Sequence, residues 1–150
     1  MSTTELRLHL AAPPEAVYAA LTDPRAVSEW MHPDDMEVHA FDARVGGPIH
    51  VSLTYADPTR AGKSSARTDS YRGRFTELVP FERVAQTLAF DTADPAMRGE
   101  MTIRFRLIPT PEGTELTARH EDVPPGIAPA DNDLGWRMSF DRLRRLLEAG

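Results

Sequence analysis

The chain has 150 residues, a formal net charge of −6 and no cysteine. Its length fits one domain that folds without a disulfide or a metal. Without cysteine, disulfide scaffolds, thiol catalysis, cysteine-ligated zinc and iron–sulfur clusters are excluded. An acidic chain with no basic stripe is not expected to bind nucleic acid. No signal core opens the chain, and no apolar run reaches the roughly 20 residues that span a bilayer. We therefore expect a single cytoplasmic domain over residues 1–150, without membrane insertion.

The first part of the chain predicts one strand and two short helices. Residues 5–10 alternate polar side chains with leucines, which is the period of a half-buried strand. Pro13 and Pro14 then open a helix, because the first helical positions need no N–H donor. Pro24 separates this helix from a second one, which stops at Pro33.

From residue 36 to Pro124 the sequence predicts antiparallel strands. The expected strands are 36–41, 49–55, 71–80, 84–90, 101–107 and 116–121. Polar and apolar residues alternate in 49–55, 84–90, 101–107 and 116–121. In the clearest of them, one face is wholly apolar and is formed by Met101, Ile103, Phe105 and Leu107. Arg104 and Arg106 take the opposite face, so this strand should have one buried side and one solvated side.

The last segment, from about Asp131 to Glu148, predicts a long amphipathic helix. Its apolar residues recur at spacings of four, three and four: Trp136, Phe140, Leu143 and Leu147. Strands flanked by helices indicate an α+β domain. We expect a curved antiparallel sheet of about six or seven strands around this helix. A sheet bent around one helix rarely fills completely, so we also expect a ligand cavity toward the short helices.

Several segments together resemble one family. In chain order they are APPEAVYAALTDP (12–24), Trp30, the glycine pair 46–47, GRFTELVPFERV (73–84), GTELTARH (113–120) and the closing helix (135–147). They resemble the branch of the START-like (SRPBCC) superfamily that is named after the activator of Hsp90 ATPase homologue 1. That branch is related to polyketide cyclase/dehydrase domains. The resemblance implies a helix-grip (Bet v 1/START-like) domain with an internal cavity, in a family whose members mostly lack an assigned reaction.

His120 is the best candidate for a catalytic residue. By alternation it shares the inner face of its strand with Leu116 and Ala118. A partly buried imidazole titrates near neutral pH. His120 is therefore either a hydrogen-bonded structural histidine or a donor or acid/base that lines the cavity.

Other inward residues are candidate ligand contacts. Tyr55, Tyr71 and Gln86 are polar, and buried tyrosine and glutamine need partners, so each is either paired with the frame or offered to a ligand. Four apolar candidates are either core residues or part of the cavity wall: Trp30, Met101, Trp136 and Met138.

Common catalytic signatures do not occur. There is no Gly-x-Ser-x-Gly elbow, no pair of carboxylates at catalytic spacing and no dinucleotide fingerprint, so we expect no cofactor. The five histidines show neither His-x-His nor His-x-x-x-His spacing, so we expect no metal site.

Three functions stay open. The first is binding of a small hydrophobic or amphipathic molecule, as a carrier or sensor. The second is a cyclase/dehydrase-type enzyme acting on a polyketide-like substrate, which needs at least two convergent ionisable groups. The third is an Hsp90-type co-chaperone interaction. Because the sequence offers one inward ionisable residue, His120, we rank binding first and the chaperone partnership last. A monomer or a homodimer is expected.

Overall fold

The computed structural model describes residues 2–31, 35–54 and 68–148. Within them, seven strands form one curved antiparallel sheet in the order β1-β7-β6-β5-β4-β3-β2. The strands are β1 (Ser2–Leu10), β2 (Asp35–Phe41), β3 (Pro48–Thr54), β4 (Thr68–Val79), β5 (Arg83–Phe90), β6 (Met101–Thr110) and β7 (Gly113–Val123). The helices are α1 (Pro14–Thr22), α2 (Pro24–Trp30) and α3 (Pro129–Glu148). The predicted α+β helix-grip architecture is confirmed.

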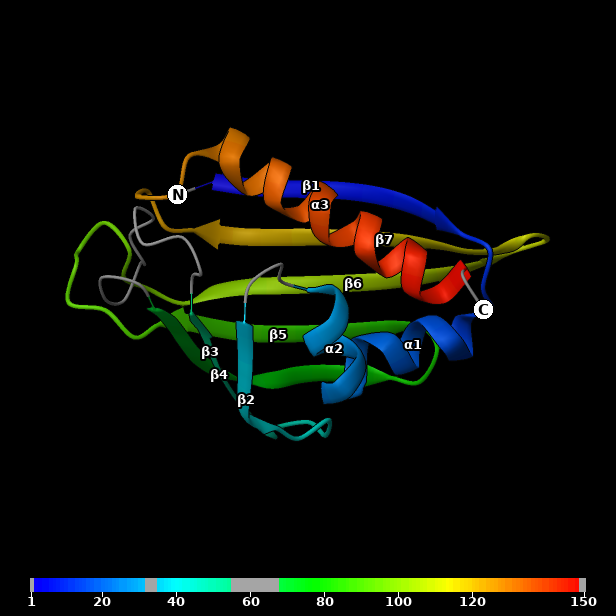
Figure 1. The fold of residues 1–150 in the computed structure, drawn as a ribbon, viewed down its shortest axis with the longest axis horizontal. Coiled ribbons are helices and arrows are strands. Elements are labelled where there is room, and N and C mark those ends of the chain that lie inside the picture. Colours follow the sequence, from blue (N-terminus) through cyan, green and yellow to red (C-terminus); the bar gives the residue numbers. More distant parts are fainter. Residues whose placement is uncertain (1, 32–34, 55–67, 149–150) are drawn as a thin grey trace.

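The three helices cover the same face of the sheet. Figure 1 shows α3 lying obliquely across it, with α1 and α2 beside the C-terminal half of α3. Helix α3 begins at Pro129, two residues before the predicted start, because a proline fits the first turn of a helix. No helix among the described residues is long and apolar enough to cross a membrane.

Prolines and one aspartate define the two short helices. Pro14 and Pro24 occupy the first helical positions of α1 and α2. Asp23 lies between the two helices and serves both of them. Its backbone N–H donates to the carbonyl of Ala19, and its Oδ1 accepts from the N–H of Arg25 at 2.9 Å. One residue thus ends α1 and caps α2, which explains the sharp turn between them.

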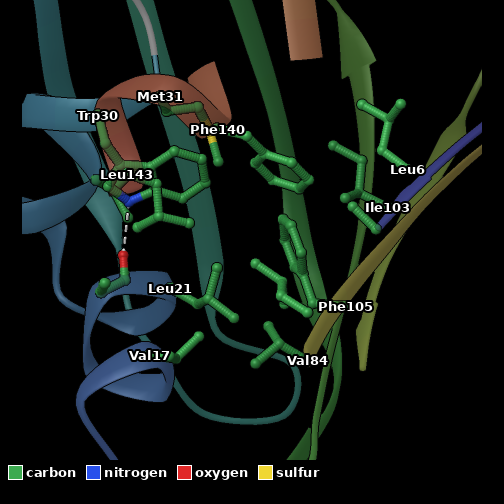
Figure 2. Packing of buried hydrophobic residues seen from close by; sticks show 14 of the residues in the cluster. Leu6, Val17, Leu21, Trp30, Met31, Val84, Ile103, Phe105, Phe140 and Leu143 are labelled. Carbon is green, nitrogen blue, oxygen red and sulfur yellow. Dashed lines mark hydrogen bonds between the residues drawn. The ribbon is translucent and has the colours of Figure 1, made fainter. Parts of the chain in front are cut away.

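The core lies between the sheet and the helices. In β6, the apolar face is buried and Arg104 and Arg106 are exposed, as the sequence predicts. Figure 2 shows Phe140 and Leu143 of α3 on the helix side of this core, with Ile103 and Phe105 on the sheet side. All four side chains are almost completely buried.

Helix α3 also fixes α2. The last carbonyls of a helix lack partners within the helix. Here the hydroxyl of Ser139 donates to the carbonyl of Met31 at 2.6 Å, and Nε of Arg142 donates to that of Trp30 at 2.9 Å. The indole N–H of Trp30 in turn donates to the carbonyl of Ala20 in α1 at 2.8 Å (Figure 2). The three helices therefore form one hydrogen-bonded layer.

Truncation of the α3 core face should destabilise the protein. Phe140→Ala and Leu143→Ala should each lower the free energy of unfolding by about 2–5 kcal/mol, because each leaves a cavity at the contact between helix and sheet. Met138→Ala is the control, since Met138 lies on the same helix and is 47% exposed. Its effect should stay within about 0.5 kcal/mol. Urea denaturation measures all three, and equal midpoints would contradict the packing.

Candidate functional site

Two polar side chains, from β5 and β7, lie on either side of β6 on the largely apolar inner face of the sheet. Gln86 of β5 and His120 of β7 both pair in register with Ile103 of β6, one from each side. Gln86 is 3% exposed and His120 is 6% exposed. Because neighbouring strands are roughly 4.8 Å apart, the two Cα atoms are separated by about 10 Å. We call this pair the inner polar pair.

Partners from α3 and β6 surround the imidazole of His120, and Thr4 of β1 is joined to it through Asn132. Nδ1 accepts from the indole N–H of Trp136 at 3.1 Å and lies 3.2 Å from Nδ2 of Asn132. Nδ2 of Asn132 also donates to the hydroxyl of Thr4 at 3.0 Å. Nε2 of His120 lies 3.1 Å from Sδ of Met101.

These contacts determine the tautomer of His120. An indole N–H can only donate, so Nδ1 of His120 must carry the lone pair and Nε2 the proton. Burial lowers the pKa of His120 to about 4. At neutral pH the ring is therefore an uncharged donor, and its N–H points at a thioether sulfur, which is a weak acceptor.

The side-chain amide nitrogen of Gln86 has no such partner. This Nε2 atom is buried and makes no hydrogen bond. The residues opposite Gln86 on the neighbouring strands are Phe75 and Ile103, and Val84 and Leu88 flank it along β5. A buried donor without an acceptor costs about 1–3 kcal/mol. Among the described residues, the amide nitrogen of Gln86 is thus a buried donor on the inner face that the frame leaves unsatisfied.

Most of the other predicted site residues also lie on the inner side. Tyr71 is buried and packs edge-on against Phe90 at 6.4 Å, and burial raises the pKa of its hydroxyl. Met101 is buried beside His120, and Trp136 is half-buried between His120 and Phe105. Trp30 is fully buried and hydrogen-bonded to α1, so it lies in the core between the helices.

One predicted site residue does not lie on the inner side. Met138 was expected to bound the cavity, but its side chain is 47% exposed. It follows Trp136 by two positions, or about 200° around the helix, so it faces away from the sheet. Tyr55 lies outside the described residues.

Sequence reasoning missed Thr4 and Asn132. Thr4 continues the alternation of Leu6 and Leu10 by one step, so extending the strand toward the N-terminus would have found it. Asn132 precedes Trp136 by four positions and therefore shares its helix face. Among the described residues, no group of three histidine, aspartate or glutamate side chains could hold a metal ion.

Comparisons with known proteins agree with the fold. The family model described as activator of Hsp90 ATPase homolog 1-like protein matches residues 11–148. The crystal structure of protein CV1439 from Chromobacterium violaceum is 35% identical, with a TM-score of 0.86 and 99% of both chains covered. The AHSA1 protein from Silicibacter pomeroyi is 21% identical, with a TM-score of 0.78 and 99% of both chains covered.

A further similar structure has a larger chain. DynU16, a protein in the dynemicin biosynthetic locus, is 21% identical, with a TM-score of 0.69. The match covers 99% of this chain and 48% of DynU16. At this identity the likeness shows the fold alone. None of the curated proteins matches the chain.

The neutral state of His120 predicts an acid-dependent loss of stability. Its pKa is about 4 in the folded protein and 6.5 in its ordinary state, so the unfolded chain takes up the proton first as the pH falls. The neutral state of His120 therefore contributes about 3 kcal/mol to the free energy of unfolding above pH 6.5. This contribution is lost as the pH falls toward 4. Urea denaturation between pH 7.5 and 4 of the wild type and of His120→Gln measures it. The difference between their free energies of unfolding should become smaller as the pH falls. A difference that stays constant with pH would rule out a neutral buried His120.

Proposed function

Because the chain belongs to the activator of Hsp90 ATPase homolog 1-like family, we propose that it binds a small, largely apolar molecule against the inner face of its sheet, as a carrier or sensor. The fold of this family is compatible with such binding. A chaperone partnership is supported by nothing more than the family name, so we rank that function last.

One observation carries the proposal: the buried Nε2 of Gln86 has no hydrogen-bond partner. A sheet face that only had to pack against α3 would gain stability from an aliphatic residue here. A ligand with an acceptor oxygen would offset the unfavourable burial of the amide. The neighbouring Nε2–H of His120 would gain as well if its weak sulfur acceptor were replaced by oxygen.

The ionisable groups favour binding over catalysis. Among the described residues, the buried side chains that ionise are His120 and Tyr71. Burial lowers the pKa of His120 and raises that of Tyr71, so both are uncharged at neutral pH. Acid–base catalysis works best with a pKa near the working pH. A cyclase/dehydrase-type enzyme is therefore the second candidate.

A larger side chain beside His120 should block binding. Met101→Trp should weaken binding of the neutral fluorescent probe Nile red by about tenfold or more, because a larger ring takes up the volume that the ligand would occupy. Met138→Trp is the matched control, and it should bind the probe like the wild type because Met138 is exposed. Fluorescence titration measures affinity, and circular dichroism checks the fold. Equal affinity of the two folded variants would place the ligand elsewhere.

Gln86→Leu should separate stability from binding. The substitution removes the unsatisfied amide with little change in volume, so the free energy of unfolding should rise by about 1–3 kcal/mol. Nile red carries a carbonyl acceptor, and its affinity should fall by about 2- to 10-fold, as expected for the loss of one hydrogen bond. Thr87→Val on the same strand is the control. A variant that is both less stable and equally able to bind would contradict the role of Gln86.

A further inference from the structure

The outer face of the sheet, opposite the helices, carries a half-open groove of about 560 Å³. Most of its lining side chains are charged and come from β1, β4, β5, β6 and β7. Its arginines are Arg7, Arg83, Arg104, Arg106 and Arg119. Five arginines on one face of a protein with a net charge of −6 require an explanation.

The strand register places arginines directly opposite one another twice. Arg104 of β6 pairs with Arg119 of β7, and Arg106 of β6 pairs with Arg83 of β5. Like charges that face each other across two strands destabilise a sheet. Each pair therefore needs a neutralising group.

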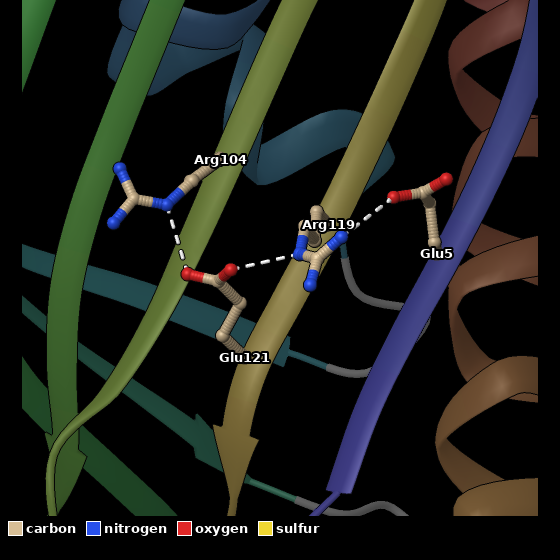
Figure 3. Close-up of polar contacts among 4 residues, drawn as sticks. All are labelled: Glu5, Arg104, Arg119 and Glu121. Carbon is tan, nitrogen blue, oxygen red and sulfur yellow. Dashed lines mark hydrogen bonds and ion pairs between the residues drawn. The ribbon is translucent and has the colours of Figure 1, made fainter.

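The chain itself neutralises the first pair. Oε1 of Glu121 accepts from Nε of Arg104 at 2.8 Å, and Oε2 accepts from Nε of Arg119 at 2.7 Å (Figure 3). Glu5 adds a second contact, with its Oε2 3.3 Å from Nη1 of Arg119. The hydrogen bond from Arg104 lowers the pKa of Glu121, so this carboxylate stays charged. One oxyanion thus bridges two opposed guanidinium groups.

The second pair has no such bridge. Among the described residues, no carboxylate contacts Arg106, and Arg83 has one distant partner, Glu77, with 3.7 Å between Nε and Oε1. The same row continues through Thr117 of β7 to Arg7 of β1. Arg7 also has no ion pair within the described part of the chain. Three guanidinium groups and one hydroxyl therefore lie in a single row, which we call the outer arginine row.

We propose that the outer arginine row binds the phosphate group of a small-molecule phosphate monoester, which takes the place that Glu121 takes in the neighbouring row. Two unpaired guanidinium groups, on Arg7 and Arg106, match the double negative charge of a phosphate monoester. Guanidinium groups bind phosphate oxygens through paired hydrogen bonds. The hydroxyl of Thr117 lies between these two arginines in the register and adds a neutral donor.

The acidic rim limits the size of the ligand. Glu5, Glu77 and Glu115 also line the groove, around the arginines. They repel an extended polyanion such as a nucleic acid, an acidic peptide or an anionic membrane surface. A compact phosphate group fits within this rim. The site is separate from the inner polar pair, because the sheet lies between them, and the two proposals stand or fall independently.

Titration with phenyl phosphate and with benzoate at constant ionic strength tests the site, followed by amide and arginine Nε–H signals in NMR spectra. Phenyl phosphate should bind at one site and benzoate at least about fivefold more weakly, because it carries one negative charge. Arg106→Gln should weaken phosphate binding by about 10- to 100-fold, as expected for lost charged hydrogen bonds. Arg98→Gln, an exposed arginine outside the groove, is the control. Absence of saturable binding, equal binding of benzoate, or an equal loss in Arg98→Gln would overturn the proposal.

A second variant tests the bridging argument itself. Glu121→Ala removes the carboxylate between Arg104 and Arg119, so phenyl phosphate should then also shift the Nε–H signals of these two arginines. The wild type should show no such shift at the same concentration. Unchanged signals in Glu121→Ala would mean that an opposed arginine pair is not enough to bind an oxyanion here.

Discussion

Helix α3 packs against the inner face of the sheet, and the other features of the molecule depend on this contact. The apolar face of the helix buries Phe140 and Leu143, which fixes its position against the sheet. The same docking brings Trp136 to the ring of His120 and the hydroxyl of Ser139 to the end of α2. Because one rigid helix provides the core and the polar contacts, the tautomer of His120 follows directly from how the hydrophobic core packs.

Strand alternation divides the chemistry between the two faces of the sheet. In β7, His120 points inward while its neighbours Arg119 and Glu121 point outward. Residues adjacent in the sequence of β7 therefore face opposite sides of the sheet, one side uncharged and buried and the other charged and exposed. A register slip by one residue would bury the charges and expose the imidazole, so the apolar residues that set the register of β6 and β7 also keep the two sites apart.

The sequence was sufficient for the fold but only partly sufficient for the site. Alternation correctly turned Gln86 and His120 inward, because a strand has two faces and one of them is apolar. The same logic failed for Met138, whose place depends on the helical period and not on alternation. The partners of His120 could not be predicted, because the position of Trp136 over β7 depends on how α3 docks. The sequence placed Arg104 and Arg106 on the outer face, but the arginines that they face could be identified only from the register between strands.

Gln86 and Arg106 share a property that an apolar core residue such as Phe140 lacks. Each of the two sits where a different side chain would make the sheet more stable: Gln86 leaves a buried donor unsatisfied, and Arg106 faces Arg83 without a bridging carboxylate. Residues that break a local rule without compensation within the fold are typical of functional sites. The two exceptions also differ in kind, since one is an uncharged donor among apolar side chains and the other is a cation in water. A neutral, apolar ligand suits the first and an anion the second, so a molecule that binds one face has little affinity for the other.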